Sequence, residues 1–142
     1  MIGLLADRKT LTLAAAKRIA AAAEKVAAKN GWDMFIAIVD DGGNLMYLER
    51  MDDAQLGSLD VSIQKARSAL LFKRPTKVME DAVTAGRIVV MTLPNALPVE
   101  GGLPLLADGK IVGAIGVSGA TAPEDGIVAK AGADELLKLL RS

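Results

Sequence analysis

The residues best suited to chemistry lie in a glycine-rich segment between Glu100 and Thr121. Glycine inside a strand marks the close approach of a ligand or of another backbone, and a glycine-rich junction with a helix can offer amide groups to an anion. The glycine spacing matches neither the dinucleotide fingerprint nor the P-loop. It leaves open whether the segment forms one wall of a pocket or packs tightly against a helix. Its candidate ligand-binding residues are Gly101, Gly102, Ser118, Gly119 and Thr121.

A second group of candidates, Arg50, Met51 and Asp52, follows a predicted strand. A guanidinium can clamp a carboxylate through two parallel hydrogen bonds. The alternative is a solvated loop in which Asp52 or Asp53 caps the next helix. Lys65 is a further candidate anchor for an anionic ligand.

Acid–base chemistry would fall to carboxylates, lysine or tyrosine, because the sequence has neither histidine nor cysteine. Their absence excludes the usual Ser or Thr triad, a thiolate nucleophile, disulfides and a zinc cluster. We therefore predict no metal site. Glu100 is the candidate catalytic residue, and the other acid–base candidates are Asp52, Asp125, Lys65 and Tyr47.

Length and composition predict one domain over residues 1–142. Hydrophobic residues make up 51% and aromatic residues 3%, which predicts an aliphatic core with apolar surface left over for homo-oligomerisation. The formal net charge is zero, so nucleic acid is not an expected partner. No leader or membrane-spanning run is recognisable, and we expect a cytoplasmic protein.

Four helices are expected from the apolar spacing. The first is capped by Thr10 or Thr12 and runs to about Lys29, before an Asn-Gly stop signal. The second carries an apolar seam over residues 56–70, the third covers 76–83, and the last runs from 123 to about 140. Because Lys65 and Arg67 lie off the seam, we expect both to face solvent or an interface.

Five strands are expected, over residues 34–40, 45–50, 87–93, 103–107 and 110–118. Turn residues 41–44 and the Asp108-Gly109 pair predict two hairpins. The element order α-β-β-α-α-β-β-β-α with two hairpins favours an α/β (α+β) fold, in which helices pack on an antiparallel sheet.

Five motifs, in this order, resemble those of the GlcG/HbpS-like family of small haem-binding and haem-degrading proteins, which also occurs as the C-terminal domain of some PduO-type cobalamin adenosyltransferases. The resemblance covers residues 11–136, and any one motif alone would not carry it. The motifs are AIVDDGGNL at 37–45, RMDDA at 50–54, KARSA at 65–69, GGLPL at 101–105 and GAIGVSG at 113–119.

The resemblance implies a profilin-like sandwich with a five-stranded antiparallel sheet, and homo-oligomers in which dimers assemble into tetramers or octamers. Characterised members bind haem or respond to iron and redox stress, and others are encoded in operons for glycolate or diol metabolism. Many relatives have glycine where this chain has Asp53. Any haem here would lack histidine ligation, leaving Met, Tyr, Lys, a carboxylate, a hydroxyl such as that of Thr121, or no protein ligand.

Three hypotheses follow. The first is binding of haem or another anionic small molecule in a glycine-rich pocket at a subunit interface. The second is an enzyme that acts on a small organic acid with a Glu or Asp as acid–base. The third is an oligomeric accessory protein of a metabolic operon.

Overall fold

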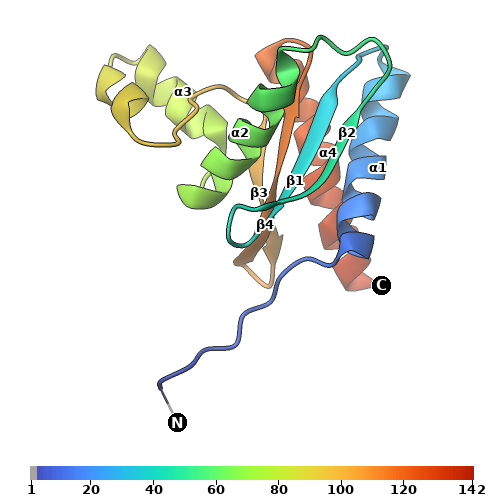
Figure 1. The fold of residues 1–142 in the computed structure, drawn as a ribbon, viewed down its shortest axis with the longest axis vertical. Helices are drawn as coiled ribbons and strands as arrows, with labels where there is room; N and C mark the ends of the chain where they lie inside the picture. The colour runs from blue at the N-terminus through green and yellow to red at the C-terminus, as the bar shows by residue number, and fades with distance from the viewer. Residues whose placement is uncertain (1–2) are drawn as a thin grey trace.

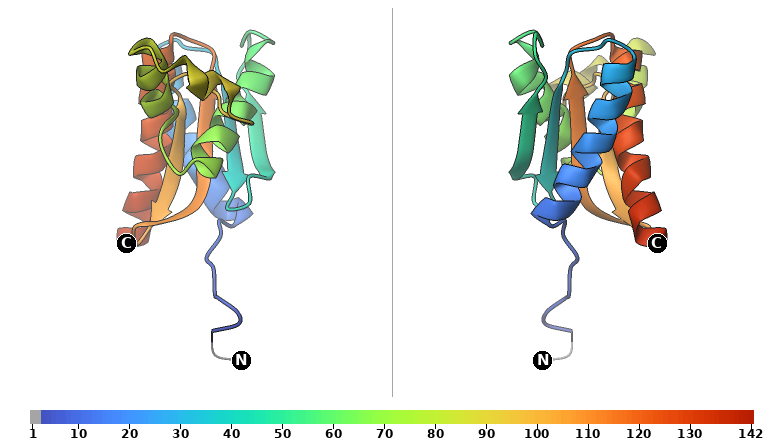
Figure 2. Two further views of the ribbon diagram at one scale, coloured as in Figure 1. Left: turned by 90° about the vertical axis from the view of Figure 1, so that its left-hand side faces the viewer. Right: turned by 90° about the vertical axis from the view of Figure 1, so that its right-hand side faces the viewer.

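An antiparallel sheet separates two layers of helices in the computed structural model, which describes residues 3–142 (Figure 1). Helices α1 and α4 lie side by side on one face, and α2 covers the other face with α3 beside it (Figure 2). The elements are α1 (Leu13–Lys29), β1 (Phe35–Asp40), β2 (Leu45–Arg50), α2 (Ser58–Leu71), α3 (Thr76–Thr84), the 3-10 helix η1 (Ile88–Thr92), β3 (Gly102–Ala107), β4 (Lys110–Ser118) and α4 (Ala122–Arg141).

The helix boundaries and both hairpins agree with the sequence. The hydroxyl of Thr12 accepts a hydrogen bond from the Ala15 N–H at 3.1 Å and so caps α1. The helix ends before Gly31, whose φ of +74° is the left-handed conformation that glycine adopts freely. The turns after Asp40 and Ala107 connect antiparallel neighbours as expected.

The predicted number of strands is wrong, because residues 3–142 contain four strands in the order β2-β1-β4-β3. The segment predicted as a strand at 87–93 contains η1 (Ile88–Thr92) instead, with local hydrogen bonds such as that from the Val90 N–H to the Arg87 carbonyl. The Val and Ile content of this segment favours a strand. However, a strand added beside β3 would lack a hydrogen-bond donor at Pro104. The sheet therefore ends at β3.

The two faces of the sheet differ in side-chain size. Large residues such as Ile36, Ile38 and Ile115 pack against α1 and α4 in the main core. The opposite face carries Ala37 and Gly116, among other small residues, under α2. This difference lets α2 approach the sheet closely.

Helix α2 buries a face that is largely polar, and this corrects two expectations. Leu56, at the start of the predicted apolar seam, is 71% exposed, whereas Ser62 is fully buried. Lys65, which we expected to face solvent or an interface, is 1% exposed, while Arg67 is half-buried. The buried face of α2 carries small residues because it contacts the glycine-bearing strand β4. Lys65 is buried because its ammonium group pairs with the Asp125 carboxylate inside the protein.

Apolar side chains remain exposed on several elements. They include Leu56, Leu59, Val78, Ile88, Val89, Met91 and Ile127. Exposed apolar surface of this extent is typical of interfaces. Within residues 3–142, no helix combines the length and the apolar character that crossing a bilayer would require.

Replacing Gly116 with alanine should destabilise the protein by about 1–3 kcal/mol or more, because the new Cβ would collide with the Ser62 carbonyl oxygen and force α2 away from the sheet. Gly57→Ala is the matched control, since no atom lies within 4 Å of a Cβ built there. Urea unfolding measures both variants, and we expect the control to change stability by less than about 0.5 kcal/mol. Equal effects of the two substitutions would contradict the close packing of α2.

Candidate functional site

Both groups of candidate residues lie at the same end of the sheet, but at opposite edges. Phe35, the first residue of β1, pairs with Arg50 on one side and with Ser118 on the other. Gly102 begins β3 at this end and pairs with Gly116. Because β1 and β4 lie between β2 and β3, Arg50 and Gly102 are roughly 14 Å apart at ordinary strand spacing. Within one chain, the two groups do not form two walls of one small pocket.

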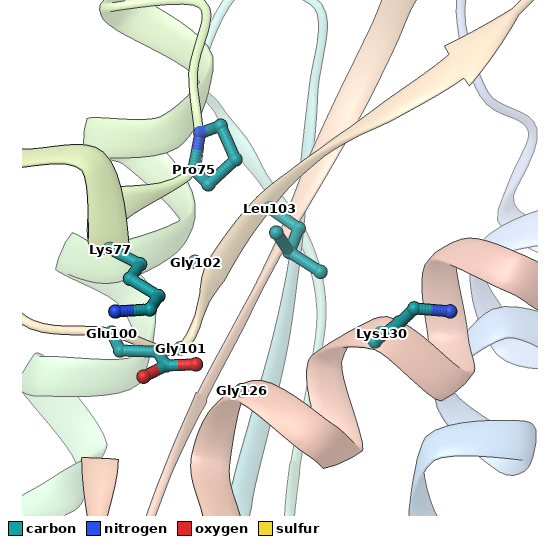
Figure 3. A pocket seen from close by; sticks show the side chains of 8 residues that line it. All are labelled: Pro75, Lys77, Glu100, Gly101, Gly102, Leu103, Gly126 and Lys130. Carbon is teal, nitrogen blue, oxygen red and sulfur yellow. The ribbon is translucent and has the colours of Figure 1, made fainter. Parts of the chain in front are cut away.

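A pocket of about 260 Å³ lies at the β3 edge, between α3 and α4 (Figure 3). Three of the sequence candidates line it: Glu100, Gly101 and Gly102. The remaining lining residues, which the sequence analysis missed, are Pro75, Lys77, Leu103, Gly126 and Lys130. A glycine inside a helix is unfavourable, so Gly126 is the signal that could have drawn attention to α4.

The pocket floor is glycine because the chain segments behind it leave no room for a side chain. A Cβ at Gly101 would lie 2.6 Å from the Val117 carbonyl oxygen and 2.8 Å from the Lys65 Nζ, and the φ of Gly101 is +134°. A Cβ at Gly102 would collide with the Lys65 carbonyl oxygen. These two glycines therefore serve the packing and line the pocket at once. The glycines farther along β4 and after it, at positions 113, 116 and 119, make close packing contacts and lie outside the lining of this pocket.

Glu100 extends a half-buried carboxylate into the pocket, against the backbone of Gly126 (Figure 3). Its backbone N–H donates to the Glu80 carboxylate at 3.1 Å, which fixes the start of the side chain. Among residues 3–142, no side chain donates a hydrogen bond to the Glu100 carboxylate or forms an ion pair with it. A carboxylate in this state is available to a ligand.

The two lysines of the pocket are each paired within their own helix. Lys77 contacts Asp81 at 2.9 Å on α3, and Lys130 contacts Asp134 at 2.7 Å on α4. All four side chains of these pairs are exposed, so the pairs contribute little to stability. The lysines can reach a ligand at the pocket rim, but neither is an unpaired charge.

Lys65 lies behind the pocket floor and forms a buried ion pair with Asp125. Its Nζ is 2.8 Å from the Asp125 Oδ2 and donates to the Val117 carbonyl at 2.9 Å, while the Ala120 N–H donates to the other Asp125 oxygen at 3.0 Å. Burial raises the pKa of Asp125, although the Lys65 ammonium and the amides of Ala120 and Gly119 oppose that rise. The pair connects α2, β4 and the start of α4.

Ser118 and Thr121 have structural partners outside the pocket lining. The Ser118 hydroxyl bonds to the Ser58 hydroxyl at 3.0 Å in the buried contact between β4 and α2. Thr121 caps α4: its hydroxyl accepts from the Glu124 N–H, and the Glu124 carboxylate accepts from the Thr121 N–H. Thr121 is exposed, so a neighbouring molecule can still reach it.

The Arg50–Ala54 loop is held at the β2 edge by the Met51 N–H, which donates to the Met34 carbonyl at 3.0 Å. Arg50 and Asp52 are exposed, and Met51 is half-buried. Asp53 has a φ of +66°, a conformation that glycine adopts most easily. This backbone requirement favours glycine at this position.

A further perturbed carboxyl, that of Glu49, lies outside the pocket on β2. Burial and the neighbouring Glu24 carboxyl raise the pKa of Glu49 to about 8, and burial together with Glu49 raises the pKa of Tyr47. No group of three or more Asp, Glu, His or Cys side chains in residues 3–142 is arranged to hold a metal ion.

A larger groove of about 950 Å³ lies at the opposite end of the sheet, next to the two hairpin turns. It is lined in part by exposed residues 6–9 and by residues 107–112. None of the candidate residues lies there, so the glycine-rich pocket remains the candidate site.

Comparisons with known proteins agree with the resemblance seen in the motifs. A family model described as haem-degrading protein HbpS-like matches residues 11–134. Protein GlcG of Escherichia coli strain K12 is 46% identical over 103 residues, which make up 72% of this chain and 77% of GlcG.

Solved structures share the fold. A double mutant of HbpS from Streptomyces reticuli superposes with a TM-score of 0.86 at 35% identity, covering 94% of this chain and 92% of that one. A complex described as PduOC with haem has a TM-score of 0.80 at 25% identity, covering 89% of this chain and 94% of that one.

Replacing Lys65 with methionine should cost about 3–5 kcal/mol of unfolding free energy, because Asp125 would be left buried without its counter-charge. The double variant Lys65→Met/Asp125→Asn should lose less than the sum of its two single variants. Lys77→Met, which breaks the exposed pair with Asp81, is the matched control and should cost less than about 1 kcal/mol. Urea unfolding measures all four, and strictly additive losses would disprove the coupling.

The raised pKa of Glu49 predicts a pH-dependent stability. Its ordinary value is 4.5 and its folded value is about 8, so between these values the folded state holds a proton that the unfolded state has released. Stability should therefore fall as the pH rises from about 4.5 to 8. Glu49→Gln should flatten this slope and be the more stable protein at pH 8.5, as measured by thermal unfolding at a series of pH values. If thermal stability changes with pH in the same way in both proteins, the raised pKa of Glu49 is contradicted.

Proposed function

Because the chain belongs to the HbpS-like family of haem-degrading proteins, we propose that it binds haem or another anionic small molecule at the pocket that contains Glu100, Gly101 and Gly102. The observation that carries the proposal is this pocket at the edge of β3, with two lysines at its rim and an unpaired carboxylate inside. The haem complex of PduOC, a protein of the same fold, supports haem as the first ligand to test.

The pocket of one chain is too small for a whole tetrapyrrole. Its volume of about 260 Å³ lies below the range of about 300–1,000 Å³ that is typical for drug-sized ligands. One carboxylate-bearing edge of such a molecule fits it, and the rest would need a second wall. We propose that another copy of the chain supplies this wall, so that the site lies at a subunit interface.

Homo-oligomerisation is supported by the apolar side chains that a single chain leaves exposed. Val78 follows Lys77 in α3, and Ile127 follows Gly126 in α4; each is about half exposed. The Arg50–Ala54 loop lies at the other edge of the sheet, where a neighbouring copy could bring it to the pocket. We propose dimers that assemble further into tetramers or octamers, as the family resemblance implies.

A haem bound here would have no imidazole ligand, because the chain lacks histidine. With only a carboxylate-bearing edge inside the pocket, the iron at the ring centre would lie outside it, where Lys77 and Lys130 are the side chains of the rim that could meet it. Met51 or Thr121 could reach it from a second copy. An iron without a strong protein ligand is compatible with reversible haem binding, in which the propionates and the apolar ring supply the affinity.

An enzyme that acts on a small organic acid is the second candidate function. The size of the pocket and the unpaired, half-buried Glu100 carboxylate favour it, because a general base needs a free carboxylate next to the substrate. Chemical conversion of the bound acid, lost on Glu100→Ala, distinguishes this function from binding. An oligomeric accessory protein remains the third candidate, and it requires assembly without any small ligand.

Titration with haemin should give a saturable shift of the Soret band, and Arg50→Ala should weaken binding by about three- to tenfold, since a guanidinium–carboxylate contact contributes about 1 kcal/mol at a partly exposed site. Arg18→Ala, on the exposed face of α1, is the matched control and should bind haemin like the unaltered protein.

The same samples should be examined by analytical ultracentrifugation, because Arg50 can contribute only if copies associate. No saturable Soret shift would contradict haem binding. If Arg50→Ala leaves the Soret titration unchanged, the Arg50 loop of a neighbouring copy does not form the second wall of the site.

A further inference from the structure

The carboxylate of Glu100 occupies the space that an anionic ligand would need. It lies against Gly126, where a Cβ would collide with its Oε2, and it shares the pocket with Gly101 and both lysines (Figure 3). Glycine at position 126 makes room for this side chain at the expense of helix stability. The side chain is thus accommodated by the fold.

The charges around the pocket disfavour an additional anion. Lys77 and Lys130 contribute two positive charges, whereas Asp81, Asp134, Glu80 and Glu100 contribute four negative charges. The buried pair of Lys65 and Asp125 behind the floor adds no net charge. A second carboxylate placed within about 5 Å of Glu100 would meet a repulsion of more than 1 kcal/mol even at the surface of the protein.

Only one of these carboxylates is free to relieve the repulsion by taking up a proton. Asp81 and Asp134 are paired with the lysines, and Glu80 accepts the N–H of Glu100. Each of these would lose a favourable contact on protonation. Glu100 would lose no hydrogen bond or ion pair, only a longer-range attraction to Lys77. As a carboxylic acid it would gain an O–H that can donate to the ligand.

We propose that Glu100 makes anion binding in this pocket proton-coupled: one anionic group enters as Glu100 takes up one proton from solvent. This inference rests on the proposed function, namely that the pocket binds an anion. The protonated Glu100 then donates a hydrogen bond to the bound carboxylate in place of repelling it. Glu100 acts as a specificity-determining residue that favours uncharged or protonated ligands at high pH and anions at low pH.

Propionate is a suitable probe, because it carries a single carboxylate and fits a pocket of this volume. Its binding can be followed by NMR through the amide signals of Gly101, Gly102 and Gly126 in the uniformly ¹⁵N-labelled chain. We expect the dissociation constant to be about tenfold higher at pH 7.5 than at pH 5.5. Glu100→Gln, which stands in for the protonated side chain, should bind more than about tenfold more tightly than the unaltered protein at pH 7.5, with no difference between the two pH values.

Two further variants test whether the pH dependence requires the Glu100 carboxylate at its place in the pocket, or only negative charge nearby. Glu135→Gln removes one carboxylate from α4 outside the pocket lining, and it should keep the pH dependence of the unaltered protein. Gly126→Ala keeps every charge but displaces the Glu100 carboxylate. The ratio of its dissociation constants at the two pH values should therefore fall toward one, whatever the new methyl group does to the affinity itself.

The outcomes distinguish this proposal from the proposed function. If neither propionate nor haemin shifts the three glycine signals in the unaltered protein or in Glu100→Gln, the pocket is not an anion site and the proposed function fails. If propionate binds with the same affinity at both pH values, or if Glu100→Gln binds no more tightly, the site stands and the proton coupling is overturned. The proton coupling is also overturned if the ratio of the dissociation constants at the two pH values is the same in Gly126→Ala as in the unaltered protein.

Discussion

The buried ion pair between Lys65 and Asp125 is the interaction on which the rest of this end of the molecule depends. One ammonium group joins helix α2 to the backbone of β4 and to the first turn of α4, and the carboxylate also holds the loop that precedes α4. Removing either partner would leave an uncompensated charge in the interior, which is far more costly than losing an exposed pair. Because the Lys65 Nζ lies directly behind Gly101, the same contact fixes the floor of the pocket.

The glycines of β3 and β4 follow from this arrangement. A lysine can reach a partner on the far helix only if α2 lies almost in contact with the sheet, and a side chain at Gly116 would prevent that approach. The close packing leaves Gly101 and Gly102 without side chains at the sheet edge, where they form a smooth floor between α3 and α4. Close packing and the open pocket floor are therefore two consequences of one constraint, rather than alternative explanations of the same glycines.

The sequence was sufficient for local features but not for those set by distant partners. Caps, stop signals and turn residues predicted the helix ends and both hairpins, because these depend on neighbouring residues. The strand predicted at 87–93 failed because its Val and Ile residues favour a strand only where a neighbour can pair with them, and β3 offers an edge that contains Pro104. Lys65 was expected outside because its partner, Asp125, is sixty residues away in the sequence.

Of the residues that line the pocket, the sequence identified Glu100, Gly101 and Gly102. It missed Lys77, Gly126 and Lys130, whose helices meet β3 only in the folded chain.

The strand order explains why one chain is not enough for a large ligand. The family motifs at Arg50 and at Gly101 end up at the same end of the sheet, yet β1 and β4 separate them. No movement of side chains can close a gap of two strands, whereas a neighbouring copy that docks at the β3 edge can present its own β2 edge to the pocket. Val78 and Ile127, which follow the pocket residues Lys77 and Gly126, are exposed where such a copy would bind. Under the proposed function, assembly would determine ligand size: the pocket of a single chain has room for a small carboxylate, and a molecule as large as haem would need the second wall that another copy supplies.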